Sequence, residues 1–352
     1  MNILEKYITQ TLVAVTLLAL FGLVCLFSFF SLIDQLGDTG RGNYDVVQAL
    51  LYVLLTTPKL SFELFPIAAV IGSMVTLGML AQNSELVVIR SSGISRFDLA
   101  IILSKASLIL ILVALVIGEL IAPLSEESAQ NRRSFAMSDQ VSINTMDGFW
   151  ARDGNSFINI LKVLPGEKVE DVYIYEFDSG NNLRNSIHAS TAAYENERWI
   201  LDDIEQTSIA DTGISMTRYQ QADWPSLLDP EMVNFVMVKP QYLTFFGLIK
   251  YIRFLRQNAQ ETLPYEQALW IKLIKPFSIW GMILLAILLV QSESRFTPVG
   301  QRVFFGTLIG VIFHIVDQIS GHVGIVYNVH PLVSVAGPTL VLLVTIFYLI
   351  RS

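Results

Sequence analysis

Apolar residues gather in six long segments, three on each side of a more polar stretch of about 140 residues. The segments cover approximately 11–33, 66–80 with an apolar lead-in from 46, 97–122, 269–290, 303–325 and 332–350. A helix needs ~20 predominantly apolar residues to cross a bilayer, and most of these segments approach that length. The pattern therefore predicts a polytopic α-helical membrane protein with six transmembrane helices and one inserted extramembrane domain.

The polar stretch between the third and fourth segments has the pattern of short β-strands. Residues 157–160, 172–175 and 199–201 are rich in β-branched and aromatic residues, and turn residues such as Gly154 and Asn155 separate them. Six or seven such strands predict an all-β domain, an antiparallel sandwich or jelly roll. A charged helix before it and a basic amphipathic helix from Tyr242 to Gln257 flank the strands. The expected division of the chain is 1–123, 124–262 and 263–352.

The second apolar segment is too long for one straight span. Pro58 and Pro66 interrupt it, which predicts a short amphipathic helix, a break near Thr57-Pro58, and then a spanning helix. Lys59 lies directly after the expected break. A cation there is either an anchor at the membrane surface or a ligand contact, and the sequence leaves both open.

A short capped helix is expected over about 84–92, between the second and third spans. Ser84 is placed to cap its N-terminus, and Gly93 to end it. Ser95 and Asp98 have capping-box spacing and are expected to start the third span. The short helix is either a simple connector or a docking element for a partner, because apolar side chains lie beside Glu85 and Arg90.

The net charge of −8 lies entirely in the central stretch, where residues 124–262 hold 20 acidic and 12 basic residues. This balance argues against nucleic acid as a partner. The single cysteine, Cys25, permits no disulfide within one chain, and the four histidines show no ligand spacing, so no metal site is expected.

Lysine and arginine in the short connections predict the orientation. Segments 1–10, 81–96, 291–302 and the C-terminus carry basic residues, whereas 34–45 is mainly acidic and 326–331 has neither lysine nor arginine. Both termini are therefore expected in the cytoplasm and the central domain outside.

Ionisable residues also lie inside the apolar segments. Lys272 and Lys275 lie near the start of the fourth span, and His314, Asp317 and Gln318 interrupt the fifth. Asp317 could be a proton relay, a contact to a partner helix, or a residue near the outer membrane surface. The chain has no G-x-x-x-x-G-K-[ST], G-x-S-x-G, H-E-x-x-H or C-x-x-C motif, so we expect no enzyme active site and no bound cofactor.

Several stretches together resemble the LptF/LptG family of lipopolysaccharide-export permease subunits, its LptG members more than its LptF members. They are Gly78-Met79-Leu80-Ala81-Gln82 with Ser84-Glu85-Leu86-Val87-Val88 and Ser92-Gly93, Gly118-Glu119 with Ala122-Pro123, Gly148-Phe149-Trp150-Ala151-Arg152-Asp153-Gly154, and Val316-Asp317-Gln318-Ile319. The resemblance covers essentially the whole chain.

The resemblance implies an inner-membrane permease subunit of an ABC transporter with a periplasmic jelly roll between its third and fourth spans. It implies pairing with an LptF-like subunit and binding of an LptB-like cytoplasmic ATPase dimer, which would hold the ATP. The pair would extract lipopolysaccharide and pass it to LptC-like and LptA-like periplasmic bridge proteins. The alternatives are a proton-coupled secondary transporter, with Asp317, Glu119 and the lysines of the fourth span as its relay, and a non-transporting envelope scaffold.

The resemblance and the charge pattern together nominate three sets of site residues. Cations expected at the outer rim of a lipid cavity, for lipid phosphates, are Lys59, Arg132 and Arg133. Residues expected to contact the ATPase are Ser84, Glu85, Leu86, Val87, Ile89 and Arg90. Polar residues expected in a gate helix are His314, Asp317 and Gln318.

Overall fold

The computed structural model describes residues 3–137, 143–164, 168–178, 180, 182–195, 198–210, 213–224, 240, 243–258, 260–291 and 298–351. The chain forms two compact units. The first contains Met1–Asp38, Ala49–Ala129 and Leu263–Ser352 and is helical. The second contains Thr39–Gln48 and Gln130–Thr262 and holds the β-sheet.

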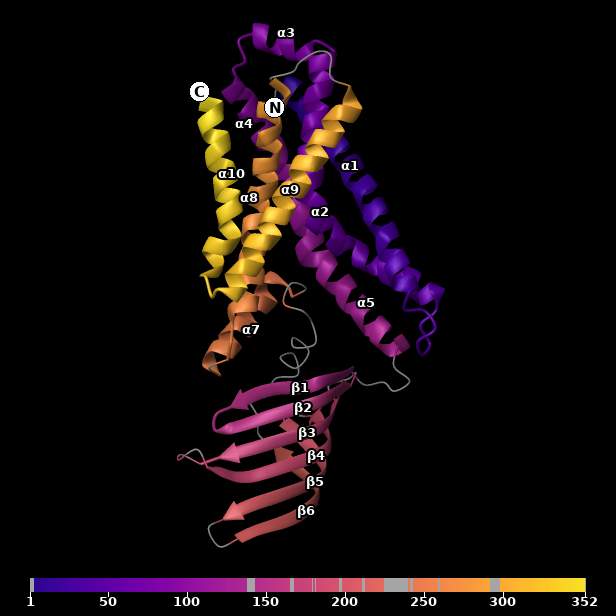
Figure 1. Ribbon diagram of the computed structural model, residues 1–352, viewed down its shortest axis with the longest axis vertical. Coiled ribbons are helices and arrows are strands. Elements are labelled where there is room, and N and C mark those ends of the chain that lie inside the picture. The colour runs from indigo at the N-terminus through magenta and orange to yellow at the C-terminus, as the bar shows by residue number, and fades with distance from the viewer. Residues whose placement is uncertain are drawn as a thin grey trace. The chain divides into compact units, whose positions relative to one another are not determined.

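The described residues contain six helical segments that are long and apolar enough to cross a membrane. The third is a run of three consecutive elements (Figure 1). The segments are α1 (Ile3–Leu36), α2 (Val46–Gln82), α4 (Arg96–Val116) with η1 (Ile117–Ile121) and α5 (Ala122–Met137), α8 (Leu263–Gln291), α9 (Val299–Val326) and α10 (Pro331–Arg351). The polytopic helical fold with an inserted β domain is confirmed.

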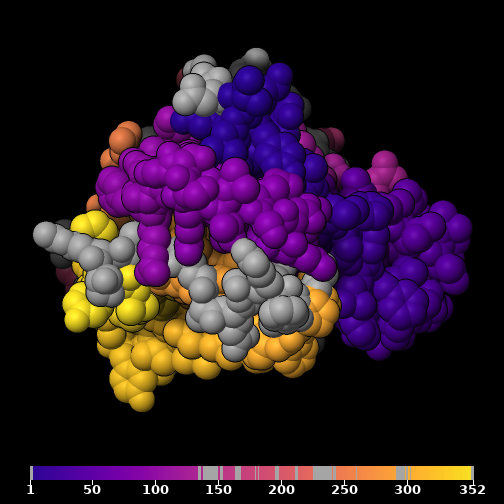
Figure 2. Space-filling model, turned by 90° about the horizontal axis from the view of Figure 1, so that it is seen from above, coloured from indigo at the N-terminus to yellow at the C-terminus, as the bar shows by residue number. Residues whose placement is uncertain are grey.

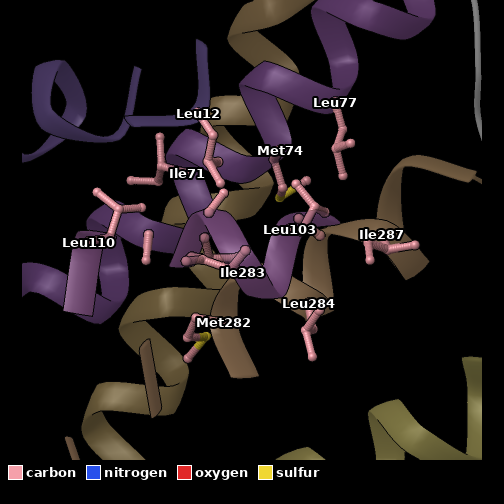
Figure 3. Packing of buried hydrophobic residues seen from close by; sticks show 14 of the residues in the cluster. Leu12, Ile71, Met74, Leu77, Leu103, Leu110, Met282, Ile283, Leu284 and Ile287 are labelled. Atoms are coloured by element: carbon pink, nitrogen blue, oxygen red, sulfur yellow. The ribbon is translucent and has the colours of Figure 1, made fainter. Parts of the chain in front are cut away.

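The core of the helical unit lies between α1, α2, α4 and α8. Figure 3 shows leucine, isoleucine and methionine side chains from these helices meeting there, among them Leu12, Met74, Leu103 and Ile283, each at most 4% exposed. Methionine fills irregular gaps in such packing. Most of the residues from Leu64 to Ala81 in α2 are buried, so α2 is the central helix of the unit.

The predicted break at Pro58 is wrong, because α2 is one helix from Val46 to Gln82 with both prolines inside it. Proline lacks an N–H, and a membrane helix tolerates it when other groups bond the freed carbonyls. The hydroxyls of Thr56 and Thr57 both donate to the carbonyl of Val53, at 3.1 and 2.8 Å, next to the carbonyl of Leu54 that Pro58 leaves without its helical partner. The turn before Pro58 therefore carries side-chain hydrogen bonds in addition to those of the backbone.

The short helix α3 (Glu85–Ser91) lies at the end of the helical bundle where both chain ends lie (Figure 1). Figure 2 looks down on this end and shows the segment around α3 beside the start of α1. Gly93 follows α3 with φ 88° and donates to the carbonyl of Arg90, as a helix-ending glycine does. The predicted side-chain cap by Ser84 is wrong, because Ser84 has φ 62° and its side chain makes no capping hydrogen bond.

The capping box at the start of α4 is confirmed. The Ser95 hydroxyl accepts from the backbone N–H of Asp98 at 3.1 Å, and the Asp98 carboxylate accepts from the backbone N–H of Ser95 at 2.9 Å. Two of the N–H groups at the helix start are thereby satisfied.

The second unit contains one antiparallel sheet whose strands follow the chain order (Figure 1). The strands are β1 (Ile143–Asp153), β2 (Ser156–Leu164), β3 (Lys168–Phe177), β4 (Leu183–Glu195), β5 (Arg198–Ala210) and β6 (Gly213–Trp224). The three predicted strand segments lie in β2, β3 and β5. Among the described residues each strand pairs with its neighbours in sequence, so the jelly-roll connectivity stays a prediction.

One face of the sheet is apolar in its central strands. Ile160, Val172, Ala189 and Ile204 are partners across β2, β3, β4 and β5, and each is at most 3% exposed. The alternation of buried and half-buried positions along these strands is typical of a sheet with one covered face.

The connection before α2 and the helix after the sheet also belong to the second unit. The backbone N–H of Asn43 donates to the carbonyl of Ala136 in α5 at 2.7 Å. Helix α7 (Phe245–Gln257) starts at Thr244, whose hydroxyl accepts from the N–H of Gly247 at 3.1 Å. The predicted start of this helix at Tyr242 lies outside the described residues.

Candidate functional site

Two lysines of α8 carry their ammonium groups into the helical unit. Lys272 and Lys275 are each 8% exposed and lie one turn apart on the same helix. Lys272 donates to the Glu119 carboxylate at 2.6 Å and lies 3.5 Å from the carbonyl oxygen of Gly118. Charges at membrane depth are costly unless they are paired, so this contact fixes α8 against η1.

Glu119 lies in the π-helical turn η1, which widens the third span for five residues. Such turns shift the side chains that follow them and occur often at functional sites. A Cβ atom at position 118 would fall on the ring of Phe62 from α2, so Gly118 permits the close approach of η1 and α2. The wide turn thus places the Glu119 carboxylate at the ammonium of Lys272.

Lys275 contacts α2 rather than η1. It donates to the backbone carbonyl of Glu63 at 3.2 Å, and its ammonium lies 5.6 Å from the centre of the Phe62 ring. A cation within about 6 Å of an aromatic centroid is attracted to the ring face. The Glu63 carboxylate lies 3.8 Å from the ammonium of Lys59.

A small cavity separates Lys275 from α9. It is lined by residues of three helices, namely Pro66, Ile67, Lys275, Ser278, Gly310, Phe313, His314 and Asp317. Two of the three predicted gate residues, His314 and Asp317, therefore share one cavity with a buried lysine. Gln318 does not line the cavity; it is exposed, and its Nε2 lies 3.2 Å from Nε2 of His314.

Together these contacts join η1 and α2 to α8 through polar groups inside an apolar bundle, and polar groups of α9 line the cavity beside them. The arrangement can hold the helices in a defined register and can bind water between opposite charges. Within the described ranges, no group of three or more His, Cys, Asp or Glu side chains is placed to hold a metal ion.

Helix α3, the short helix expected to contact the ATPase, presents two different faces. Leu86 and Ile89 are each 7% exposed and pack on the core of the helical unit, so they anchor α3. Val87 and Val88 point outward, at 47% and 62% exposed. An exposed pair of valines on a short surface helix is suited to a partner groove.

Glu85, the predicted acidic contact, also has partners within the chain. Its carboxylate accepts from the Tyr7 hydroxyl of α1 at 3.4 Å and from the Asn83 side chain at 3.2 Å. Arg90 is exposed on the same helix. The start of α1 thus holds the first turn of α3 in place.

The three predicted cations lie in different units. Lys59 lies in α2 of the helical unit, with 24% of its side chain exposed beside Glu63. Arg132 and Arg133 lie in the part of α5 that belongs to the second unit, where Arg132 is exposed and Arg133 is half-buried. The two arginines are adjacent in sequence, and Lys59 has Glu63 as a neighbour in its own helix.

Sequence reasoning missed the pairing of Lys272 with Glu119 and the contact of Lys275 with α2. The signal available was two lysines at i and i+3 in an apolar helix, a spacing that puts both on one face. It also missed Gly306 and Gly310, a G-x-x-x-G pair in α9 that packs on Ile67 and Ile71 of α2. That motif is a known mark of close helix contact in membranes.

The whole chain is similar to known proteins. The family described as lipopolysaccharide export system permease LptF/LptG matches residues 6–352. The chain is 32% identical over 351 residues to the lipopolysaccharide export system permease protein LptG of Haemophilus influenzae, which covers 99% of this chain and 98% of that protein. It is 33% identical over 341 residues to LptG of Escherichia coli K12, covering 96% and 95%.

Proposed function

Because the chain belongs to the LptF/LptG family of lipopolysaccharide export permeases, we propose that it is a transmembrane subunit of an ABC transporter for lipopolysaccharide. It extracts the lipid from the inner membrane and passes it toward a periplasmic bridge. The family match over residues 6–352 carries this proposal, since it includes all six spans and the inserted β domain.

We further propose that both termini and α3 lie in the cytoplasm and the β domain in the periplasm. The support is the basic residues of segments 1–10 and 81–96, namely Lys6, Arg90 and Arg96, against the mainly acidic segment 34–45. Both chain ends and α3 share one end of the helical bundle, so one orientation places all three on the same side (Figure 1).

The energy source is a separate LptB-like ATPase dimer that docks on α3. Val87 and Val88 supply an apolar contact surface, and Glu85 and Arg90 supply charges beside it. The chain itself has no phosphate-binding G-x-x-x-x-G-K-[ST] motif, which fits a subunit whose partner binds ATP. An LptF-like subunit completes the permease, and LptC-like and LptA-like proteins receive the lipid.

Lys59, Arg132 and Arg133 contact the phosphates of lipopolysaccharide. Arginine and lysine bind phosphate oxygens through charge-assisted hydrogen bonds, and the acyl chains need apolar walls. Arg132 is exposed and Lys59 has a quarter of its side chain exposed, so both can meet a ligand.

The test is transport by the reconstituted complex. The chain is co-expressed with its genomic neighbours, purified in mild detergent and placed in vesicles containing lipopolysaccharide. We expect an ATPase to co-purify, this chain alone to hydrolyse no ATP, and lipopolysaccharide to pass to a soluble acceptor only when ATP is added. Release driven by a proton gradient without ATP would instead support a secondary transporter, and a complex that never releases lipopolysaccharide would contradict the proposal.

A further inference from the structure

Helix α9 packs against its neighbours through glycines. Among its described residues, those that are buried are all glycines: Gly306, Gly310, Gly321 and Gly324. A Cβ atom at Gly310 would lie 3.0 Å from the Ile67 side chain, and one at Gly306 would lie 3.1 Å from Met74. At these glycines the helix approaches α2 through its backbone, while Val311 and Phe313 are partly buried against the core of the helical unit.

The cavity at Lys275 lies directly beside this contact. Gly310 lines it, and His314 and Asp317 follow one and two turns further along α9. Opposite them, Lys275 is 8% exposed and comes from α8. A buried ammonium, a carboxylate and an imidazole thus face one small space from two helices.

Lys275 has hydrogen-bonding capacity left over. An ammonium group carries three N–H donors. Among the described residues, Lys275 donates one hydrogen bond, to the carbonyl of Glu63 at 3.2 Å. The Phe62 ring covers another side at 5.6 Å. Donors of a charged group that stay unused in an apolar interior are costly, so a further acceptor is expected.

The cavity leaves about 10 Å³ in which the centre of a water molecule can lie, which is about the least room that holds one water. A buried water needs two to four polar partners, and Lys275, His314 and Asp317 supply them. Ser278, the other polar lining residue, is engaged with Thr339 at 2.8 Å.

We propose that one ordered water molecule occupies this cavity, accepts a hydrogen bond from Lys275 and donates one to Asp317, and so fixes α9 against α2 and α8. The site is independent of what the protein transports. Further along the helix, the Ser320 hydroxyl donates to the carbonyl of Ser334 in α10 at 2.5 Å, so the hydrated link is a second polar contact of α9, nearer its middle.

The experiment compares two matched lysine variants in the full-length chain within its purified complex. Hydrogen–deuterium exchange is measured for peptides of α9 and, as an internal reference, of α10. Lys275→Met removes the link to α9, whereas Lys272→Met removes an equally buried lysine that pairs with Glu119. We expect α9 to exchange about threefold to tenfold faster relative to α10 in the first variant, which corresponds to ~0.6–1.4 kcal/mol. The second variant destabilises the helical unit as a whole, so we expect it to change the exchange of α9 and α10 alike.

A second pair of variants tests the carboxylate. Asp317→Leu should raise α9 exchange as Lys275→Met does, and Gln318→Leu, an adjacent residue outside the cavity, should not. The double variant Lys275→Met/Asp317→Leu should exchange less than the product of the two single effects, because both ends of one link are lost together. An equal ratio of α9 to α10 exchange in the two lysine variants, or a double variant equal to that product, would overturn the link.

The water itself is tested on the wild-type complex, without any substitution. A density map that resolves ordered waters should show one within hydrogen-bonding distance of Lys275 Nζ and of an Asp317 carboxylate oxygen. A map of that quality with an empty cavity, or with Lys275 directly on Asp317, would refute the water-mediated contact even if the variants fail to accumulate.

Discussion

Lys272 of α8 and Glu119 of η1 form an ion pair of 2.6 Å across 153 positions of sequence. The pair is largely shielded, with 8% of the lysine and 23% of the glutamate side chain exposed. It ties the fourth span to the third at the one π-helical turn of the described chain. The contact explains why an apolar helix tolerates a lysine at this position.

Removing either partner of this pair should destabilise the helical unit. Lys272→Met leaves the Glu119 carboxylate without its cation, at a cost of about 1–3 kcal/mol given its partial exposure. The measurement is the midpoint of thermal unfolding in detergent. The exchanged variant Lys272→Glu/Glu119→Lys should recover part of the loss, and a midpoint that does not move in either single variant would refute a stabilising role.

The two faces of α3 should respond differently to substitution. Val87→Asp/Val88→Asp should leave the fold intact and lower co-purification of the ATPase more than about tenfold, because both side chains are exposed. Leu86→Ala should cost about 2–3 kcal/mol of stability, because Leu86 is buried in the core. Pull-down of the ATPase and thermal unfolding, measured on the same preparations, separate the two effects. Full ATPase binding by the double aspartate variant would show that α3 is not the docking surface.

Reversing the charge of Lys59 should weaken contact with lipopolysaccharide phosphates. Lys59→Glu is expected to lower photo-crosslinking to lipopolysaccharide from a nearby probe by about tenfold, and Lys59→Gln by less. Lys6→Glu, an exposed lysine at the start of α1, serves as the matched control and should have no effect. Unchanged crosslinking in both Lys59 variants would exclude this residue from the lipid site.

A side chain at Gly310 should push α9 away from α2. The nearest atoms to a new Cβ are those of Ile67 and Val70, at 3.0 to 3.2 Å, and they belong to a well-packed helix. Gly310→Val should therefore cost about 1–3 kcal/mol by overpacking. Gly337→Val in α10 is the control, since no atom lies within 4 Å of a Cβ there. Equal unfolding midpoints for the two variants would contradict the close contact.

The turn between β3 and β4 should make the second unit sensitive to acid. Backbone N–H groups of Asn182 and Gly180 donate to the Asp178 carboxylate, at 2.9 and 2.8 Å, and lower the pKa of that carboxyl. A lowered carboxyl pKa stabilises the fold above the unfolded value, about 3.9, and this contribution is lost as the pH falls through the folded pKa.

The measurement compares wild type with Asp178→Asn in thermal unfolding between about pH 7 and pH 3. The asparagine can accept the same hydrogen bonds but does not titrate. We expect the wild type to be more stable at neutral pH, and the difference to shrink below about pH 4. A difference that stays constant over this range would show that ionisation of Asp178 contributes nothing.

Much of the fold could be predicted because its signals are local. The span positions follow from apolar length, and the strands in β2, β3 and β5 follow from segments of β-branched and aromatic residues between turn residues. The Ser95–Asp98 cap was found because its partners are three residues apart. Two local predictions were wrong: Pro58 does not break α2, and Ser84 does not cap α3. At Pro58 the helix continues with most of the residues from Leu64 to Ala81 buried in the core, and at Ser84 the backbone takes φ 62° before Leu86 and Ile89 pack on that core.

At the candidate site, too, local features could be predicted from the sequence and long-range contacts could not. The hydrophobic pattern was enough to place six helices, because burial in lipid acts on consecutive residues. The β domain followed from β-branched and aromatic segments between turn residues. These patterns could not assign Lys272 to Glu119 or Lys275 to α2, since those partners are more than 150 residues away in sequence. Only the tertiary structure decides these partners, because a lysine in an apolar interior must find an acceptor on another helix. Lys272 finds it in the π-helical turn η1, and Lys275 finds it in the proline-containing helix α2. The glycines of α9 let that helix pack closely beside them on α2.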